Sequence, residues 1–217
     1  LSQMLAGQRP RTIVARRDWS RFVMSLMSRH PDSVEKLERL HSAMWEESLS
    51  KALSEIRAAV PDMDPVLAGA VYAESWGKRQ ERERVEGLRR MMDYGYAGRV
   101  LNRSSWDVLD LSKSPVDLVL SDKPVYRTKT FREKGDFIAV PLGPRHLFKA
   151  TIGRARQGPL DAALSSKIVT RINTALIRGA GMFVIGVDAA YEEQVRAQMG
   201  SEPIPSIADI MAEPYAL

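Results

Sequence analysis

The sequence predicts an α+β protein in which long N-terminal helices pack with a small sheet and one long helix of the C-terminal half. Three observations support this prediction. Apolar residues recur at helical spacing over residues 18–92. After Gly98 the apolar segments become short, rich in β-branched residues and interrupted by glycine and proline. Helical spacing then returns over residues 161–180.

The chain has 217 residues, which is enough for one sizeable hydrophobic core. We therefore expect a single α+β domain over residues 1–200. Its helical part is expected over about 1–95 and its sheet-containing part over about 96–200. Residues 201–217 contain three prolines and are expected to form an irregular tail.

Three helices are expected in the N-terminal half. The first covers residues 18–29. The second runs to about Val60 from a capping box in which Asp32 is followed three residues later by Glu35. The third covers residues 66–92 and becomes strongly charged toward its end.

Short strands dominate the part that follows. Four are expected, at residues 106–111, 116–120, 137–140 and 146–152, and a fifth, buried strand is expected at 182–187. Residues 161–180 should form a long helix, because apolar side chains recur at every fourth position from Leu164 to Leu176. Asp188 is expected to cap a last helix that ends near Met199.

Composition excludes several kinds of site. The chain has no cysteine, so disulfides, thiolate nucleophiles and cysteine-ligated metals are excluded. Glu38 and His41 have the spacing of di-iron ligands, but no second such pair occurs, so we expect no metal site. Phosphate-binding glycine motifs are absent, and we expect no cofactor. No apolar run approaches the ~20 residues of a membrane span, and we expect a cytoplasmic protein.

Positive charge is concentrated in blocks. The net charge is +5, and residues 123–156 hold nine Lys and Arg residues against two carboxylates. Such a block could form a basic face for an anionic partner such as nucleic acid. Solvated faces that happen to be basic are the alternative, because the block lacks the interleaved aromatic residues of single-strand binders. The candidate anion-binding residues are Lys123, Arg127, Lys129 and Arg132.

The segment LVLSDKPVY at residues 118–126 allows two interpretations of Asp122. The first is a turn, in which the Asp122 carboxylate bonds nearby backbone N–H groups and Pro124 fixes the chain direction. The second is a catalytic or metal-binding carboxylate of a hydrolase that acts on a phosphate ester, with Lys123 holding the anion. The turn is the favoured interpretation, and whether the protein is an enzyme stays open.

The order of several short motifs resembles the bacterial domain-of-unknown-function family numbered 4238. The matching positions are Gln8, Arg11, Ser121, Asp122, Pro124, Pro141, Pro144 and Asn173. The resemblance implies that these positions shape a common scaffold, and it implies no reaction. Lys123 stands where the family has asparagine, Gly143 stands where it has serine, and the family's N-terminal His-x-x-Pro motif has no match here.

The two proline-containing turns could lie together. If the strands before Ser121 and Pro141 are parallel neighbours, both turns lie at one edge of the sheet. Asn173 would then lie beside the apolar stripe of its helix, where its amide could hold a buried turn backbone. We expect this architectural role to be more important than catalysis.

Overall fold

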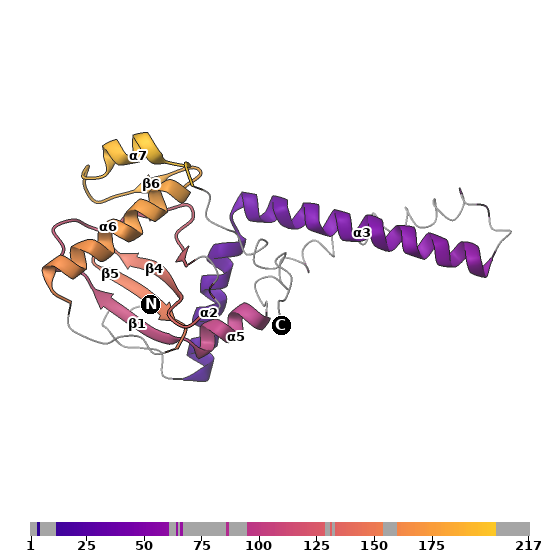
Figure 1. Cartoon of the computed structure of the whole chain (residues 1–217), viewed down its shortest axis with the longest axis horizontal. Coiled ribbons are helices and arrows are strands. Elements are labelled where there is room, and N and C mark those ends of the chain that lie inside the picture. The colour runs from indigo at the N-terminus through magenta and orange to yellow at the C-terminus, as the bar shows by residue number, and fades with distance from the viewer. Residues whose placement is uncertain are drawn as a thin grey trace.

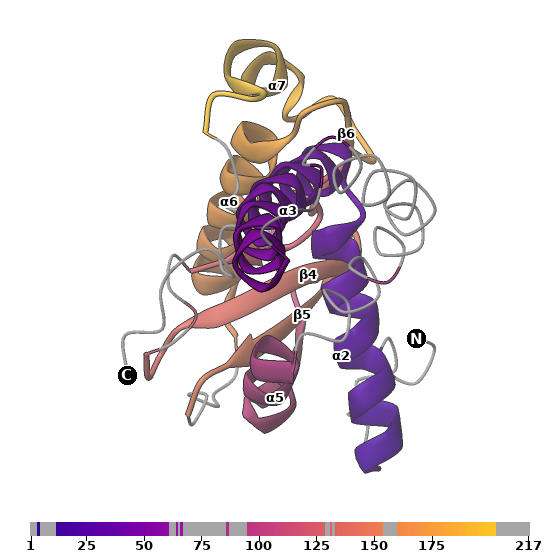
Figure 2. The same cartoon turned by 90° about the vertical axis from the view of Figure 1, so that its right-hand side faces the viewer.

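The fold is built around a four-stranded antiparallel sheet with helices on both faces (Figures 1 and 2). The computed structural model describes residues 4, 12–60, 64, 66, 86, 95–128, 131, 133–153 and 160–202. The strand order is β1-β5-β4-β3. The strands are β1 (Ser105–Asp110), β3 (Tyr126–Arg127), β4 (Phe137–Gly143) and β5 (His146–Thr151). This arrangement confirms the predicted α+β class.

Side chains alternate between the two faces of this sheet and form two hydrophobic clusters. Phe148 is fully buried on the face covered by α2 (Ile13–Ser28) and α5 (Gly95–Arg103). The neighbouring Leu147 is buried on the opposite face, against α6 (Ala162–Gly179). This alternation follows from the two-residue period of a strand, and it makes the sheet the middle of three layers.

Helix α2 begins five residues earlier than the sequence predicted. Thr12 is its N-cap, and the Thr12 hydroxyl accepts a hydrogen bond from the Ala15 N–H at 3.1 Å. The first turn was missed because Ile13 is 86% exposed and therefore does not belong to the apolar stripe. Arg16 then joins the helix to the core, since its guanidinium lies 3.9 Å from the centroid of the Trp106 ring.

Helix α3 (Pro31–Ala59) confirms the second predicted helix and projects from the body of the protein (Figure 1). Proline suits the first position of a helix, where no N–H partner is needed. The third predicted helix, at 66–92, lies almost wholly outside the described residues. Helix α6 confirms the long predicted helix, and the Asp161 carboxylate caps it by accepting the Leu164 N–H at 2.7 Å.

The strands of the main sheet differ from the prediction mainly at the proline of β4 and at the two-residue strand β3. Strand β4 does not end before Pro141 but continues to Gly143, with an irregular register between them. Strand β3 pairs with β4 only as far as Ala139, so this end of β4 lies at the sheet edge, where proline is tolerated.

A second sheet contains β2 (Leu120–Ser121) and β6 (Val184–Ile185), paired antiparallel away from the main sheet. The predicted strand at 182–187 forms only over the two residues of β6, and its predicted burial is wrong, because Met182 is 59% exposed and Ile185 is 57% exposed. The expected parallel pairing of the strands before Ser121 and Pro141 is also wrong, since these strands belong to different sheets.

The last described helix is α7 (Glu192–Gln198), shorter than expected. Asp188 does not cap it but accepts the Ala190 N–H at 2.9 Å in a local turn. Across the described part of the chain, no helix combines the length and the apolar character needed to cross a membrane. Most of the predicted tail, beyond residue 202, lies outside the described residues.

Candidate functional site

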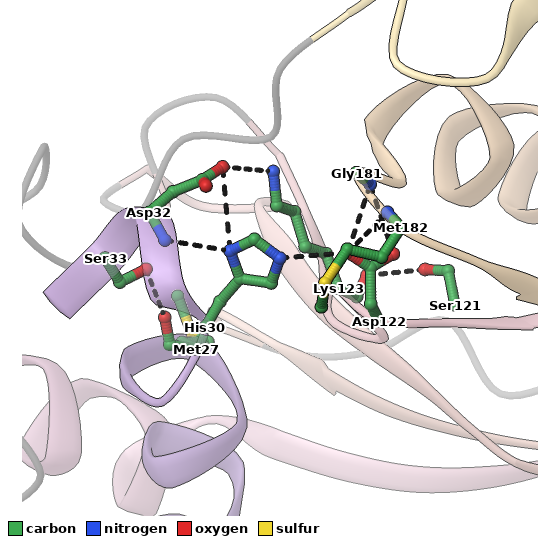
Figure 3. A network of polar contacts seen from close by, with 9 residues as sticks. All are labelled: Met27, His30, Asp32, Ser33, Ser121, Asp122, Lys123, Gly181 and Met182. Carbon is green, nitrogen blue, oxygen red and sulfur yellow. Dashed lines mark hydrogen bonds and ion pairs between the residues drawn. The ribbon is translucent and has the colours of Figure 1, made fainter. Parts of the chain in front are cut away.

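Three segments distant in the sequence meet at the Asp122 carboxylate (Figure 3). His30 comes from the corner between α2 and α3, Asp122 follows β2, and Gly181 follows α6. His30 Nε2 lies 2.9 Å from Asp122 Oδ2. The two side chains are only 7% and 2% exposed, respectively. A histidine therefore does pair with Asp122, although the sequence analysis found none for this position.

The hydrogen bonds of His30 define the tautomer of its imidazole. The backbone N–H of Asp32 donates to His30 Nδ1 at 3.2 Å, so Nδ1 is an acceptor. In the neutral imidazole, Nε2 therefore carries the proton and donates it in the hydrogen bond to Asp122. His30 also acts as the cap of α3, because its carbonyl accepts the Val34 N–H at 3.1 Å. The predicted capping box that began at Asp32 is thus replaced by His30.

Backbone N–H groups complete the surroundings of the Asp122 carboxylate. Gly181 N lies 3.1 Å from both carboxylate oxygens, and Met182 N lies 3.1 Å from Oδ2. The absence of a side chain at Gly181 permits this approach, since a Cβ there would lie 3.3 Å from Asp122 Oδ2. Together with His30, these amides give the buried carboxylate hydrogen-bond donors from two distant segments.

These contacts lower the pKa of Asp122. Burial acts to raise this pKa, but the hydrogen bond from His30, the backbone hydrogen bonds of Gly181 and Phe183 and the nearby imidazole together outweigh it. The carboxylate is therefore held in its charged form.

The favoured turn interpretation of Asp122 is not what the structure shows. The residue two positions on is Pro124, which has no N–H for the carboxylate to bond. The turn is instead stabilised by Ser121, whose hydroxyl donates a hydrogen bond to the Lys123 carbonyl at 3.0 Å. Pro124 is buried behind this turn. Asp122 is thus a long-range link between three segments.

Lys123 extends the network toward α3. Its Nζ lies 2.7 Å from Asp32 Oδ2, and its side chain is 16% exposed. The hydrogen bond from Lys123 is the main cause of a lowered pKa of Asp32, to which the charges of Lys123, His30 and Lys36 add. The ammonium group of Lys123 is therefore paired with Asp32 and is not free for the predicted anion binding.

Asn173 performs the architectural role expected of it, at a slightly different place. It is fully buried in α6. Its Oδ1 accepts the Val119 N–H at 3.0 Å, and its Nδ2 donates to the Asp117 carbonyl at 2.7 Å. The amide thus holds the segment that leads into β2 rather than the Ser121 turn itself.

The Pro141–Pro144 turn does not share an edge with the Ser121 turn. It joins β4 to β5 and contacts the chain ahead of β2, because the Pro144 carbonyl accepts the Leu118 N–H at 2.9 Å. Arg145 in the same turn forms an ion pair with Asp117. Both turns therefore help to position residues 117–122. The Ser121 turn lies at the end of this segment, and the Pro141–Pro144 turn contacts Asp117 and Leu118 from the β4–β5 hairpin.

The other predicted residues fall into two groups. Arg127 is 7% exposed, so its guanidinium lies within the protein and not on the predicted basic face. Gln8, Arg11, Lys129 and Arg132 lie outside the described residues.

A different basic surface lies along α6, beside β3. A groove of about 560 Å³ opens there, and the described residues that line it include three cationic side chains and one carboxylate. We call it the α6 groove, and it is lined by Tyr126, Lys167, Thr170, Arg171, Thr174, Ala175, Arg178 and Glu202. Arg178 is paired with Glu202 at 2.7 Å, so Lys167 and Arg171 carry the remaining positive charge of the lining.

One aromatic ring, that of Tyr126, lines this groove, and Phe137 packs beside it. Arg171 Nη2 donates to the Tyr126 hydroxyl at 3.2 Å. The Tyr126 and Phe137 ring centroids are 5.4 Å apart, and Lys149 Nζ lies 4.5 Å from the Phe137 centroid. Burial is the main cause of a lowered pKa of Lys149; Asp107 opposes the shift and Arg171 adds to it. Three strands and α6 thus gather rings and cations that the sequence keeps apart.

Neither His30 nor the α6 groove was among the sites predicted from the sequence. The His30-Pro31 pair indicates His30 as the cap of α3, because proline favours the first position of a helix and the residue before it is then the cap. The groove had a weaker signal. Lys167, Arg171 and Arg178 share one side of a helix, but only the sheet brings Tyr126 to that side.

The lowered pKa of Asp122 predicts a specific pH dependence of stability. The unfolded carboxyl titrates near pH ~3.9. Since the folded value is lower, Asp122 contributes stability above that pH and loses it as the pH falls toward the folded value. The difference in unfolding free energy between the wild type and Asp122→Asn should be constant from pH ~7 to ~5 and narrow below pH ~4. Urea unfolding at several pH values measures it; a difference that stays constant down to the lowest folded pH contradicts the assignment.

No metal site is evident in the part of the chain that the structure describes. The described residues include no group of three or more histidine, aspartate or glutamate side chains placed to hold a metal ion. The side chain of His41 lies outside that description.

Comparison with known proteins identifies a family without an assigned activity. No curated protein and no solved structure matches the chain significantly. The family described as "Protein of unknown function (DUF4238)" matches residues 1–190, which include His30, Asp122 and Asn173. With this match over most of its length and the motifs of the predicted resemblance, the chain belongs to the DUF4238 family.

Proposed function

We propose that this protein binds an anionic partner, nucleic acid, through the α6 groove and does so without catalysing a reaction. The observation that carries the proposal is the charge of the groove. Lys167, Arg171 and Arg178 line it together, and Glu202 is the one carboxylate among its described lining residues. Phosphate groups are the anions that such spaced Lys and Arg side chains contact on nucleic acids.

The position of these cations on α6 supports an extended ligand. Lys167 and Arg171 are one helical turn apart, and Arg178 follows two turns later on the same side. At a rise of 1.5 Å per residue, the stripe extends over roughly 16 Å along the helix, and Arg178 at its far end reaches a ligand only by exchanging its ion pair with Glu202. A chain of phosphates fits this arrangement better than one small anion does.

A hydrolase that uses Asp122, the alternative raised by the sequence, has less support. A general base needs an atom within reach of the proton that it takes. Both imidazole nitrogens of His30 already have partners, in Asp122 and the Asp32 N–H. The Asp122 side chain is 2% exposed and surrounded by donors from the protein itself. Such a carboxylate is better suited to joining segments than to meeting a substrate.

Salt dependence and one matched pair of variants test the proposal. The affinity for a mixed-sequence oligonucleotide should fall linearly on a log–log plot as salt rises, because binding releases counterions. Arg171→Gln should weaken binding and reduce the salt slope by about one. Arg99→Gln removes the same charge at an exposed position of α5, on the other side of the sheet, and should change neither value.

The measurement is fluorescence anisotropy of a labelled oligonucleotide at several salt concentrations. Absence of binding at low salt rejects the proposal. Equal losses for Arg171→Gln and Arg99→Gln would show general attraction by the net positive charge and would reject the α6 groove as the site.

A further inference from the structure

The aromatic end of the α6 groove carries information about the form of the nucleic acid. Tyr126 lines the groove, and the Arg171 guanidinium lies 5.9 Å from the centroid of its ring. The same guanidinium lies 5.7 Å from the centroid of Phe137. A planar cation and an aromatic ring are therefore held side by side at the surface where the proposed ligand would lie.

Hydrogen bonding and packing fix this pair in place. The Tyr126 hydroxyl accepts a hydrogen bond from Arg171, and the Tyr126 ring packs against the hydrophobic cluster beneath α6. Two strands position the rings directly, because Tyr126 in β3 is paired with Ala139 in β4, two residues beyond Phe137. A preformed aromatic surface loses little conformational entropy when a planar group stacks on it.

We infer that the α6 groove takes single-stranded nucleic acid, with an unpaired base against Tyr126 and Arg171 and the backbone phosphates along Lys167 and Arg171. This inference rests on the proposed function. Bases stack on aromatic rings and on guanidinium planes only when they are unpaired and exposed. In a duplex the base faces are hidden within the stack, so a duplex would engage the cations alone.

This arrangement also brings aromatic and basic side chains together. Their lack of interleaving along the sequence had favoured the interpretation of the basic block as a solvated face without a partner. Residues 123–156 show no regular interleaving of aromatic and basic residues along the chain. In the folded protein, Tyr126, Phe137, Lys149 and Arg171 come from three strands and a helix and interleave in space. The combination of cations and stacking surfaces is the one that single-strand binders use.

The test compares three labelled or competing polyanions in the same anisotropy assay at low salt. They are a mixed-sequence single strand, the duplex of the same sequence, and unlabelled inorganic polyphosphate as a competitor without bases. The wild type, Tyr126→Leu and Tyr126→Phe are compared. Tyr126→Phe keeps the ring and removes only the hydroxyl, while Tyr126→Leu removes the ring and keeps an apolar side chain. Thermal unfolding shows that each variant is folded at the assay temperature.

The wild type should bind the single strand at least about 10-fold more tightly than the duplex or polyphosphate. Tyr126→Leu should weaken single-strand binding by about 5- to 100-fold, the effect of losing one stacked base, and leave duplex binding unchanged. Tyr126→Phe should retain single-strand binding within about 3-fold, since the ring supplies most of a stacking contact.

Two results would overturn the inference while leaving the proposed function standing: equal affinity for single strand, duplex and polyphosphate, or unchanged single-strand binding by folded Tyr126→Leu. If Tyr126→Leu does not fold, the wild-type comparison of the three polyanions decides alone. Absence of binding to all three rejects the proposed function, and the inference with it.

Discussion

Replacing Asp122 with alanine should lower the free energy of unfolding by about 3–5 kcal/mol, the largest effect expected of any polar substitution in the described part of the chain. The variant removes the common acceptor of the His30 Nε2–H and the N–H groups of Gly181 and Met182. Hydrogen bonds to a charged group contribute about 1.5–3 kcal/mol each, and donors left buried without a partner add a desolvation cost.

Asp161→Ala is the matched control for this variant. Asp161 is a carboxylate with a purely local role, because it caps α6 through the Leu164 N–H. Its loss should cost about 1 kcal/mol. Urea unfolding of both variants at neutral pH gives the comparison. If Asp122→Ala lowers the free energy of unfolding no more than Asp161→Ala does, Asp122 has only a local role and does not stabilise the protein as a link between distant segments.

A double-mutant cycle tests the link itself. His30→Ala and Asp122→Ala should each lower the free energy of unfolding. The loss in the double variant should be smaller than the sum of the two single losses. The coupling free energy should be about 1–3 kcal/mol, as for other directly bonded buried pairs. Additive losses would show that His30 and Asp122 act independently.

Asn173→Leu should destabilise the protein by about 3–4 kcal/mol, the second large effect. Leucine has the same branching and the same number of side-chain heavy atoms but cannot bond the Val119 N–H or the Asp117 carbonyl; the first of these bonds is buried and the second is partly buried. Each backbone group that stays buried without a partner costs about 1–3 kcal/mol. Overpacking by the branched side chain adds to this loss.

Thr170→Ala provides the control, since Thr170 is exposed on the same helix one turn earlier. It should change the unfolding free energy by less than about 0.5 kcal/mol. Chemical unfolding of the two variants measures the difference in their free energies of unfolding. An Asn173→Leu variant as stable as Thr170→Ala would mean that water or a rearranged side chain satisfies both backbone groups.

The two large effects explain how residues 117–122 are held in place. Asn173 bonds Asp117 and Val119 at the beginning of this segment, and the Pro144 carbonyl accepts the N–H of the residue between them, Leu118. Asp122 then anchors its end to His30 and to the loop after α6. A stretch with only two residues of regular strand is thus positioned by hydrogen bonds with α6, the β4–β5 turn, the His30 corner and the loop after α6, and all but the bond to Pro144 involve a side chain.

The sequence by itself determined the α+β class, the long helices α3 and α6, and the importance of Asp122 and Asn173. These features are local or periodic. Helical apolar spacing follows from 3.6 residues per turn, and a buried amide within an apolar helix stripe must find backbone partners. The motif order likewise indicated the DUF4238 family, because a motif is read along the chain.

The tertiary structure alone decided which groups meet. His30 and Asp122 are 92 residues apart, and Lys149 and Phe137 approach only through the pairing of β4 with β5. Neither pairing has a period or spacing in the sequence, since each depends on the packing of separate elements around the sheet. The same holds for Arg127 and Lys123, whose charges suggested an anion-binding role, because Arg127 is 7% exposed and Lys123 is paired with Asp32. Charge is set by the residue type, whereas exposure is set by the fold.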